Sequence, residues 1–353
     1  MSIIFAILLF SFLIFIHELG HFVAAKLSGV QVNEFSMFMG PAIYKKQVGE
    51  TLYAIRCIPL GGYCAMEGED TVSDNPRAFG AAAWWKRLII LVAGSAMNLI
   101  AGILIMVIVF LPAKQITLPV IESFESFSTV NSQDGLQAGD KILEVDGENI
   151  YVLSDFSMIL SFHPGDVHDI VVERNGEKVF LDDFTMEKHA VTHESGNTGL
   201  YYGIKFTSVK ATFPAKLSYA WNSSVDTVRN VRLSLQMLLT GKAGLKDLTG
   251  PVGIVQIMSD TAAASEKTSD AILNMLYFGG FIAINLGVMN MLPIPALDGG
   301  RVVALLLTSA IEGITKKKIN PKYEGYIHGV GMILLLGLMA IIMFKDIFTI
   351  FKG

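Results

Sequence analysis

Four stretches of the chain are both apolar enough and long enough to cross a lipid bilayer as α-helices. A helix needs about 20 residues to span a hydrocarbon core of about 30 Å, and few other sequence patterns restrict a fold so strongly. The pattern predicts a polytopic α-helical membrane protein with four transmembrane helices. The stretches run from about Ser2 to Leu27, from about Arg87 to Leu111, from near Ala271 to a break at Pro293 and Pro295, and from about Tyr326 to Phe344.

The composition of the 353-residue chain agrees with a place in a lipid bilayer. Hydrophobic residues make up 52% of the chain and charged residues 17%, whereas a soluble domain carries about 25% charged residues. These values exclude a disordered chain and disfavour an ordinary soluble enzyme. The formal net charge of -5 leaves no basic field for nucleic acid, and two cysteines cannot build a disulfide framework.

Lysine and arginine residues gather in two of the predicted loops and indicate the direction in which the chain crosses the membrane. Cytoplasmic loops are enriched in these residues, whereas long translocated domains are exempt from the rule. Both loops are therefore expected in the cytoplasm, with the two termini and the segment from about Pro112 to Ser269 outside. The residues concerned are Lys45, Lys46, Arg56 and Arg77 after the first helix, and Arg301, Lys316, Lys317, Lys318 and Lys322 between the third and fourth helices.

Residues 30–69 are predicted to form a small antiparallel β-sheet on the cytoplasmic side. Short runs such as VQVNEFSMF and TLYAIRCI are separated by glycine and proline residues that favour turns. These turn signals lie at Gly40-Pro41, at Gly49 and at Pro59 to Gly62. The first part of the chain, residues 1–112, therefore combines two transmembrane helices with this sheet.

One compact α+β domain is expected in the external segment, at residues 113–212 with a core at about 116–187. Alternating apolar residues around Asp146-Gly147 and Asn175-Gly176 predict two hairpins, because these dipeptides favour tight turns between strands. From 213 to 240 apolar residues recur with a helical period, which predicts an amphipathic helix. This helix and a linker occupy residues 213–270, and residues 271–353 hold the last two transmembrane helices.

The first predicted transmembrane helix contains the sequence His17-Glu18-Leu-Gly-His21. Ionisable residues inside a span are costly, so they indicate function. His17 and His21 are four residues apart and share one face of the helix, so that both imidazoles can reach one metal ion. Glu18 can act on a water molecule at that ion, which is the arrangement of zinc hydrolases. Zinc is the favoured metal because two nitrogen ligands and an open water position are typical of its catalytic sites.

A third protein ligand must come from another part of the chain, because a catalytic zinc ion usually has three. The best candidate is Asp298, in the segment NMLPIPALDGG. Pro293 and Pro295 break the helix before it, and irregular backbone at membrane depth is tolerated only where it is buried in protein or lines a wet cavity. Two alternatives remain open. Asp298 can simply cap the next helix, or a downstream glutamate, Glu312 or Glu324, can supply the third ligand.

Several motifs together resemble the site-2 proteases, and the closest group is that of the bacterial regulator-of-sigma-E proteases. They are HELGH in the first span, the turn PLGGY, the external sequence GLQAGDKILEVDG, the segment GPVGI ahead of the third span, and NMLPIPALDGG. The likeness covers nearly the whole chain. Two departures stand out: only one external domain of the PDZ type is expected, and the second span reads AGSAMN with Ser95 where relatives often have proline. No role is therefore assigned to Asn98.

The resemblance implies roles for individual residues. It makes His17, His21 and Asp298 the ligands of a Zn²⁺ cofactor and Glu18 the catalytic base. It implies that the external domain is a circularly permuted PDZ-like domain and that the sheet at 30–69 is a membrane-associated β-hairpin region. The candidates for contact with the substrate are Asn285, Asn290, Gly61 and Gly62.

The function expected on these grounds is that of an intramembrane zinc metalloprotease in the bacterial inner membrane. Its partners would be the lipid bilayer and single-span membrane proteins, such as anti-sigma factors or remnant signal peptides, already cut once by another protease. No nucleic acid is expected to bind. The alternative is a PDZ-bearing membrane scaffold or chaperone with a metal site that is not catalytic. A structural zinc ion would need four protein ligands, and the sequence offers three.

Overall fold

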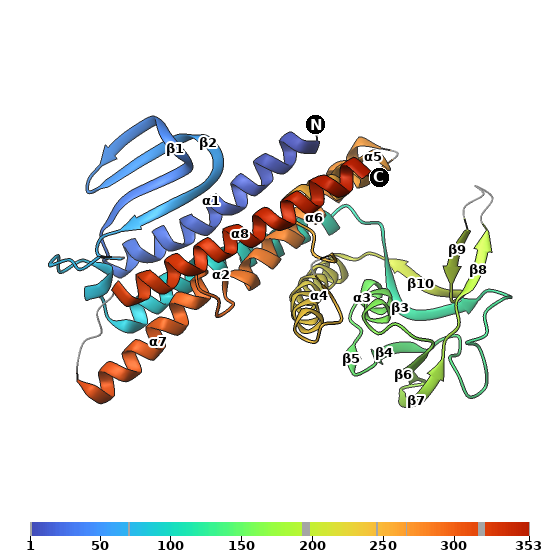
Figure 1. The fold of residues 1–353 in the computed structure, drawn as a ribbon. Helices are drawn as coiled ribbons and strands as arrows, with labels where there is room; N and C mark the ends of the chain where they lie inside the picture. The colour runs from blue at the N-terminus through green and yellow to red at the C-terminus, as the bar shows by residue number, and fades with distance from the viewer. Residues whose placement is uncertain are drawn as a thin grey trace. The chain divides into compact units, whose positions relative to one another are not determined.

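The computed structural model describes residues 2–69, 71–192, 198–244, 246–265, 267–316 and 322–352 (Figure 1). The chain forms two compact units. The helical unit is made of Met1–Met106 and Ser234–Gly353, and the smaller unit of Val107–Leu233. Because the helical unit holds both the HELGH motif and Asp298, every predicted metal ligand belongs to it.

Four helices are long and apolar enough to cross a membrane, which agrees with the four stretches expected from the sequence. Most residues of these helices are not buried, although a soluble protein would bury apolar side chains of this kind. In the apolar stretch of the last helix no described residue is buried. Such surfaces are stable only in contact with lipid or another apolar partner. The helices are α1 (Ser2–Ser28), α2 (Trp84–Phe110), α6 (Thr268–Asn290) and α8 (Lys322–Lys352).

Glycine residues let α2 approach two other helices closely. A Cβ atom on Gly20 of α1 would lie 2.4 Å from the carbonyl oxygen of Ala93, and one on Gly102 of α2 would lie 2.6 Å from the side chain of Ile284 on α6. Small residues serve this purpose in membrane proteins, where helices associate through close van der Waals packing. The two contacts place α1 and α6 against α2, and α1 carries His17, Glu18 and His21 of the predicted site.

Two shorter helices of this unit were not predicted from the sequence. They are α5 (Pro251–Ala263), which begins at the GPVGI segment, and α7 (Asp298–Thr315), which begins directly after the break at Pro293 and Pro295. Proline at the first turn of α5 is favourable because the missing N–H would have no partner within the helix. Neither helix is among those that could span a membrane by length and composition, so neither stands out in the sequence as a long apolar stretch.

The predicted sheet at residues 30–69 is present and is built from two long, bent strands, β1 (Val32–Val48) and β2 (Thr51–Met66). The inner part of β1, residues 32–37, pairs with residues 52–55 of β2 on one side and with residues 62–66 on the other. The outer part, residues 42–48, pairs with residues 51–56. Residues 62–66, called here the inner edge strand, therefore form one border of the sheet.

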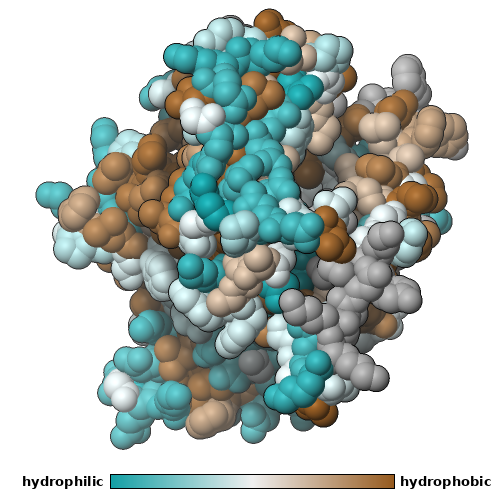
Figure 2. Space-filling model, turned by 90° about the vertical axis from the view of Figure 1, so that its left-hand side faces the viewer, coloured by the Kyte–Doolittle hydropathy of each residue, from teal (hydrophilic) through white to brown (hydrophobic). Residues whose placement is uncertain are grey.

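Side chains from α1 and from the sheet form a shared core that fixes the sheet against the helix. Phe35 of β1 lies with its ring centroid 4.8 Å from that of Phe22 and 5.8 Å from that of Phe15, both on α1. At the end of the unit that carries the sheet, hydrophilic residues cover much of the surface and hydrophobic residues lie beside them (Figure 2). The packing holds the inner edge strand beside the helix that carries HELGH.

The smaller unit is an antiparallel sheet with the strand order β10-β3-β4-β6-β7 and a short strand, β5, paired with β4. The two predicted tight turns are present: Asp146-Gly147 joins β4 to β5, and Asn175-Gly176 joins β6 to β7, each residue with a positive φ. The elements are β3 (Gln115–Phe124), β4 (Lys141–Val145), β5 (Glu148–Asn149), α3 (Leu153–Phe162), β6 (Val167–Arg174), β7 (Glu177–Thr185), β8 (His189–Thr192), β9 (Thr198–Tyr201), β10 (Ile204–Lys210) and α4 (Phe213–Leu239).

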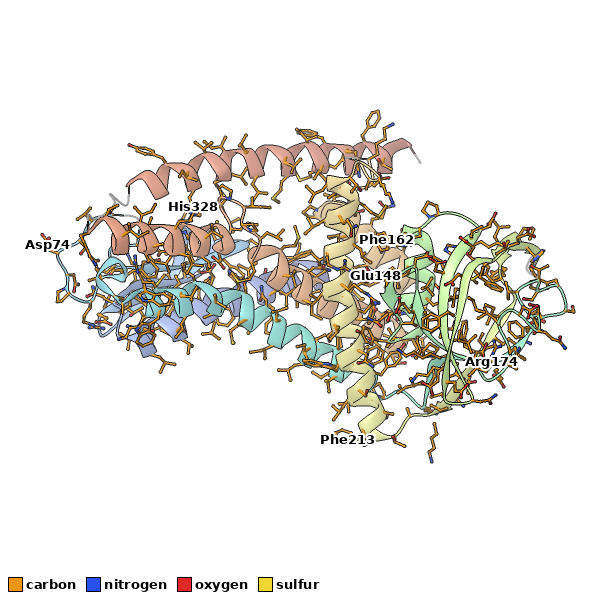
Figure 3. All side chains as sticks on the ribbon, turned by 90° about the horizontal axis from the view of Figure 1, so that it is seen from below. Asp74, Glu148, Phe162, Arg174, Phe213 and His328 are labelled. Atoms are coloured by element: carbon orange, nitrogen blue, oxygen red, sulfur yellow. The ribbon has the colours of Figure 1, made fainter. Side chains whose placement is uncertain are left out.

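Ion pairs attach the amphipathic helix α4 to this sheet domain. Arg229 of α4 donates to Asp155 of α3 over 3.0 Å and to Asp226 of its own helix over 2.6 Å. One turn further on, Arg232 is paired with Glu148 at the sheet over 2.5 Å. Glu148 and Phe213, the first residue of α4, are labelled in Figure 3. The side chain of Asp155 is fully buried, so this contact is part of the core of the unit.

Candidate metal centre

The two histidines of HELGH lie one turn apart on α1 with their rings 4.8 Å apart, centroid to centroid. Nδ1–H of His21 donates a hydrogen bond to the carbonyl oxygen of Ile90 on α2, over 2.8 Å. A carbonyl oxygen can only accept, so Nδ1 carries the proton and Nε2 of the neutral ring presents a lone pair. This hydrogen bond at Nδ1 orients the ring, as such bonds do for histidine ligands in metal sites.

Asp298, the first residue of α7, brings its carboxylate to the same point. Its Oδ2 atom lies 3.1 Å from Nε2 of His17 and 3.3 Å from Nε2 of His21, and the two Nε2 atoms are 3.2 Å apart. Ligand atoms from these residues form the one group in the described part of the chain that could hold a metal ion. Residues 277 positions apart in sequence (298 − 21) are thus brought into contact by the fold.

The geometry of these three atoms fits a zinc ion. Zinc bonds to nitrogen and carboxylate oxygen are about 2.0 to 2.1 Å long, so two ligands of a tetrahedral ion lie about 3.3 Å apart. The observed separations of 3.1, 3.2 and 3.3 Å match that spacing. Oδ2 of Asp298 is buried and makes no hydrogen bond within the described residues. Three atoms that converge in this way can hold a metal ion.

Gly94 of α2 makes room for both histidine rings. A Cβ atom at this position would lie 2.3 Å from Nε2 of His21 and 2.8 Å from Cε1 of His17. Because atoms at such distances would overlap, the two rings can occupy their places only while residue 94 lacks a side chain. Gly94 was not predictable from the sequence, since a single glycine in an apolar span carries no signal of its own.

Asn98, one turn beyond Gly94 on α2, is a polar neighbour of His17 for which the sequence predicts no role. Its side chain is 1% exposed, and its Nδ2 atom lies 3.5 Å from Nδ1 of His17. Its Oδ1 atom is buried and has no hydrogen-bond partner in the described structure. With the amide group turned over, Oδ1 can accept a hydrogen bond from Nδ1–H of His17, as second-shell partners of histidine ligands do.

The two glycines after Asp298 bring the first turn of α7 against the preceding break. A Cβ atom on Gly299 would lie 2.3 Å from the carbonyl oxygen of Met291, and one on Gly300 would lie 2.4 Å from that of Ile294. Arg301, in the same turn, is paired with Glu69, which follows β2. Close backbone approach and this ion pair hold the start of α7 beside α1 and the sheet.

Glu18 lies between the two histidines in sequence and faces the inner edge strand. A Cβ atom on Gly62 would lie 3.5 Å from Cγ of Glu18 and 3.0 Å from the carbonyl oxygen of Ser36. The glycine thus leaves space between the sheet and the Glu18 side chain. Gly61, with φ +79°, turns the chain into the inner edge strand. Glu18 therefore lies beside the border of the sheet and next to His17 in sequence.

The remaining candidates lie in α6 and α7. The amide of Asn285 donates to the carbonyl oxygen of Phe281 in its own helix, over 3.0 Å. Asn290 is the last residue of α6 and stands directly before the break that leads to Asp298. Glu312, an alternative third ligand, lies 14 residues after Asp298 on α7 (312 − 298), or about 21 Å along the helix. The side chain of Glu324, the other alternative, lies outside the described residues.

Comparison with known proteins agrees with this arrangement. The profile of Peptidase family M50 matches residues 5–338. A protein of Clostridium acetobutylicum that is named as a zinc metalloprotease is 36% identical over 350 residues, covering 98% of this chain and 97% of the relative. A zinc metalloprotease of Fusobacterium nucleatum is 32% identical over 370 residues and covers 100% of both. The regulator of sigma-W protease RasP of Bacillus subtilis is 28% identical over 435 residues, covering 99% of both.

The family profile extends over nearly the whole chain, and two of these relatives exceed 30% identity at almost full coverage. Four helices suited to a membrane, with two histidines of one span beside an aspartate, are consistent with the names of these relatives. The chain therefore belongs to peptidase family M50, the site-2 protease family, and is a zinc metalloendopeptidase of that type.

Proposed function

We propose that this protease cleaves single-span membrane proteins in or near their transmembrane segment, with His17, His21 and Asp298 as the zinc ligands and Glu18 as the general base. The observation that carries the proposal is the convergence of Nε2, Nε2 and Oδ2 within 4.8 Å of one another, on and beside helices that can cross a membrane. The described residues contain no second group of ligand atoms of this kind.

The described residues divide the catalytic work among them. When bound, zinc would polarise the carbonyl of the scissile peptide and lower the pKa of a water molecule to about 7. Glu18 takes a proton from the attacking water and gives it to the nitrogen of the leaving amine, so that the peptide C–N bond breaks and the proton balance closes. Ile90 and Asn98 hold the imidazoles of His21 and His17 through their Nδ1 atoms.

A substrate must leave its helical conformation before its carbonyl can be attacked, and the inner edge strand is suited to hold it extended. Residues 62–66 pair with β1 on one side, and the described structure places no strand on the other. A peptide can add to such an edge through main-chain hydrogen bonds. Gly62 lies next to Glu18, so a peptide bound there would have its backbone beside the general base. Asn285 and Asn290 remain candidates for contact with it.

The positions of the lysine and arginine residues support an active site toward the cytoplasmic side of a bacterial inner membrane, with both termini and the smaller unit outside. Arg77 pairs with Glu50 over 2.6 Å, and Lys26 pairs with Glu50 over 2.7 Å, at the end of the sheet that is expected in the cytoplasm. Lys317 and Lys318, which support the same orientation, lie outside the described residues.

The smaller unit is proposed to be a PDZ-like domain that excludes substrates whose external domain is still attached. A cavity of about 480 Å³ lies between α3 and the outer strand β10, lined by Phe156, Leu160, Ile204 and Phe206 among others. A helix beside an unpaired sheet edge is the setting in which PDZ domains hold peptides. The name of the Bacillus relative, a regulator of sigma-W protease, supports anti-sigma factors as substrates. The size filter proposed here requires that such substrates have already been cut once outside the membrane.

The alternative of a scaffold or chaperone with a structural metal is less well supported. A structural zinc ion is closed by four protein ligands. The described residues bring three together, which leaves one position for water and substrate.

Glu18→Gln tests the proposal. The variant is expected to keep zinc at the wild-type stoichiometry and to lose cleavage of a reporter with a single transmembrane segment, because glutamine has the shape of glutamate but cannot take the proton. Cleavage retained in purified Glu18→Gln would refute the assignment of the base. Leu19→Met, which changes a neighbouring apolar side chain at nearly constant volume, serves as the control and should cleave normally.

A further inference from the structure

The backbone that leads into Asp298 is held by a residue from the last helix. Ala296 has φ +83°, a left-handed conformation that a residue with a side chain rarely adopts. Its N–H donates a hydrogen bond to Nδ1 of His328 on α8, over 3.0 Å. The residue after it, Leu297, is extended and caps α7, and Asp298 begins the helix. The bond from His328 thus acts two residues before the carboxylate.

The position of the Asp298 carboxylate depends on the backbone before it, whereas neighbouring polar groups orient the two imidazoles. His21 is oriented by the carbonyl of Ile90, and His17 has the amide of Asn98 beside its second nitrogen. Oδ2 of Asp298 has no hydrogen bond within the described structure apart from its approach to the two imidazoles. Its position is therefore set chiefly by where residues 295–298 place the start of α7.

Two residues of α8 contact this segment from one face of the helix. Gly331 follows His328 by three positions, which places both on the same side of α8. A Cβ atom on Gly331 would lie 2.4 Å from Cβ of Pro295, so the helix and the segment are in close contact there. Figure 3 shows His328 on the side of α8 that faces the other helices of the unit. α8 is thus packed directly against the approach to Asp298.

The chemistry of the bond defines the state of His328. A backbone N–H can only donate, so Nδ1 must be unprotonated and accept, and the neutral ring carries its proton on Nε2. Loss of this acceptor would leave the N–H of Ala296 without its partner in a strained conformation. A half-buried donor without a partner is unfavourable, and its loss therefore favours another arrangement of so short a segment.

We propose that His328 is a positioning residue for the third zinc ligand: it fixes the backbone at Ala296 and thereby holds the Asp298 carboxylate opposite His17 and His21. The proposal rests on the assignment of Asp298 as a ligand. It gives α8, whose sequence contains none of the motifs of the site, a direct part in metal binding.

The test compares His328→Asn with His328→Gln and His328→Leu in the full-length protein. The Oδ1 atom of asparagine falls near the place of Nδ1 and can accept the same bond, whereas the Oε1 atom of glutamine falls near Nε2 and leucine has no acceptor. Release of zinc to a chromophoric chelator and hydrogen exchange at residues 291–298 of the zinc-free protein, by mass spectrometry, are the readouts. Tyr326→Leu, at an exposed residue of α8, is the control.

We expect His328→Leu and His328→Gln to bind zinc about 10- to 100-fold more weakly, the range found for second-shell partners, and to exchange faster at residues 291–298. In both variants kcat should fall while KM stays near the wild-type value, and His328→Asn should restore zinc binding, exchange and kcat. Wild-type zinc release and exchange in His328→Leu would overturn the proposal. Equal losses in all three variants, asparagine included, would also overturn it.

The exchange readout separates this proposal from the proposed function. If Asp298 were not a ligand, His328→Leu would still loosen residues 291–298 in the zinc-free protein, but zinc release would not change in Asp298→Asn. If His328 did not position the segment, Asp298→Asn would release zinc while exchange in His328→Leu stayed at the wild-type rate.

Discussion

Gly94 on α2 faces His21 on α1 so closely that a Cβ atom on the glycine would lie 2.3 Å from Nε2 of the imidazole. This nitrogen is one of the three atoms that converge on the proposed zinc position. The identity of residue 94 thus decides whether the ring can reach that position, although residue 94 itself offers no ligand atom.

Gly94→Ala is expected to weaken zinc binding by at least about ten-fold, because the added methyl group must displace His21, His17 or the whole of α2. Zinc stoichiometry after dialysis against a chelator measures the effect. Gly337→Ala is the matched control, since a Cβ atom at Gly337 of the membrane helix α8 would meet no atom of the described structure within 4 Å. Full zinc retention in Gly94→Ala would show that the helices separate without cost to the site.

Asn98→Leu removes the polar neighbour of His17 at nearly constant volume. We expect zinc affinity to fall about 10- to 100-fold, because the imidazole of His17 loses the group that orients its Nδ1 side. Competition with a zinc indicator gives the affinity. Asn285→Leu changes an asparagine that donates to its own helix and should leave zinc affinity unchanged. Equal zinc affinities in Asn98→Leu and in the wild type would remove Asn98 from the site.

Removal of the smaller sheet domain tests its proposed role as a filter. The N–H of Ala211 donates to the carbonyl oxygen of Lys114 over 3.0 Å, so a short glycine-serine linker can join these two residues in place of 115–210. A filter predicts that the shortened protein cleaves substrates with an intact external domain, which the full-length protein leaves uncut. Substrates trimmed beforehand should be cleaved by both at similar rates. Loss of cleavage of the trimmed substrates would indicate a binding site instead.

The packing of α4 on the sheet domain is expected to weaken as pH rises. Burial and the neighbouring carboxylate of Asp155 raise the pKa of the Asp226 carboxyl to about 7, although Arg229 acts in the opposite direction. The folded state therefore holds a proton that the unfolded chain loses near its ordinary value of 3.8, and stability declines between about pH 4 and pH 7. Arg229 contacts both acids and compensates one charge of the two.

Thermal unfolding of the full-length protein at pH 5 and pH 8 measures this dependence. The difference in Tm between the two pH values should be smaller in Asp226→Asn than in the wild type, because the variant has no carboxyl to lose the proton. Asp260→Asn, at an exposed residue of α5, should keep the wild-type difference. An identical difference in Asp226→Asn would contradict the shift.

Local chemistry explains which parts of the site were predictable from the sequence. His17 and His21 share a helix face because of their spacing, so their proximity follows from helical geometry alone. The tight turns at Asp146-Gly147 and Asn175-Gly176 were likewise predictable, since these dipeptides favour positive φ angles. The proximity of Asp298 to the histidines was expected from the number of ligands that zinc needs and from the family resemblance.

Other features depend on contacts between distant segments and were not predictable. Gly94 and Asn98 lie at the site only because α2 packs on α1. No role was assigned to Asn98 because the sequence AGSAMN around it departs from that of relatives. His328 stands in an apolar helix without a motif, and its bond to Ala296 joins positions 32 residues apart. The two ends of β2 pair with opposite sides of β1, and this pairing places Gly62 beside Glu18. Its register cannot be predicted from the alternation of apolar and polar residues alone.

Metal analysis of the purified protein and its Asp298→Asn variant decides whether Asp298 is a zinc ligand. We expect about one zinc ion per wild-type chain and its loss from Asp298→Asn, because an amide oxygen is a far weaker ligand than the carboxylate oxygen that lies 3.1 and 3.3 Å from the two imidazoles. An unchanged zinc stoichiometry in Asp298→Asn would show that Asp298 is not a zinc ligand and is no more than the first residue of α7.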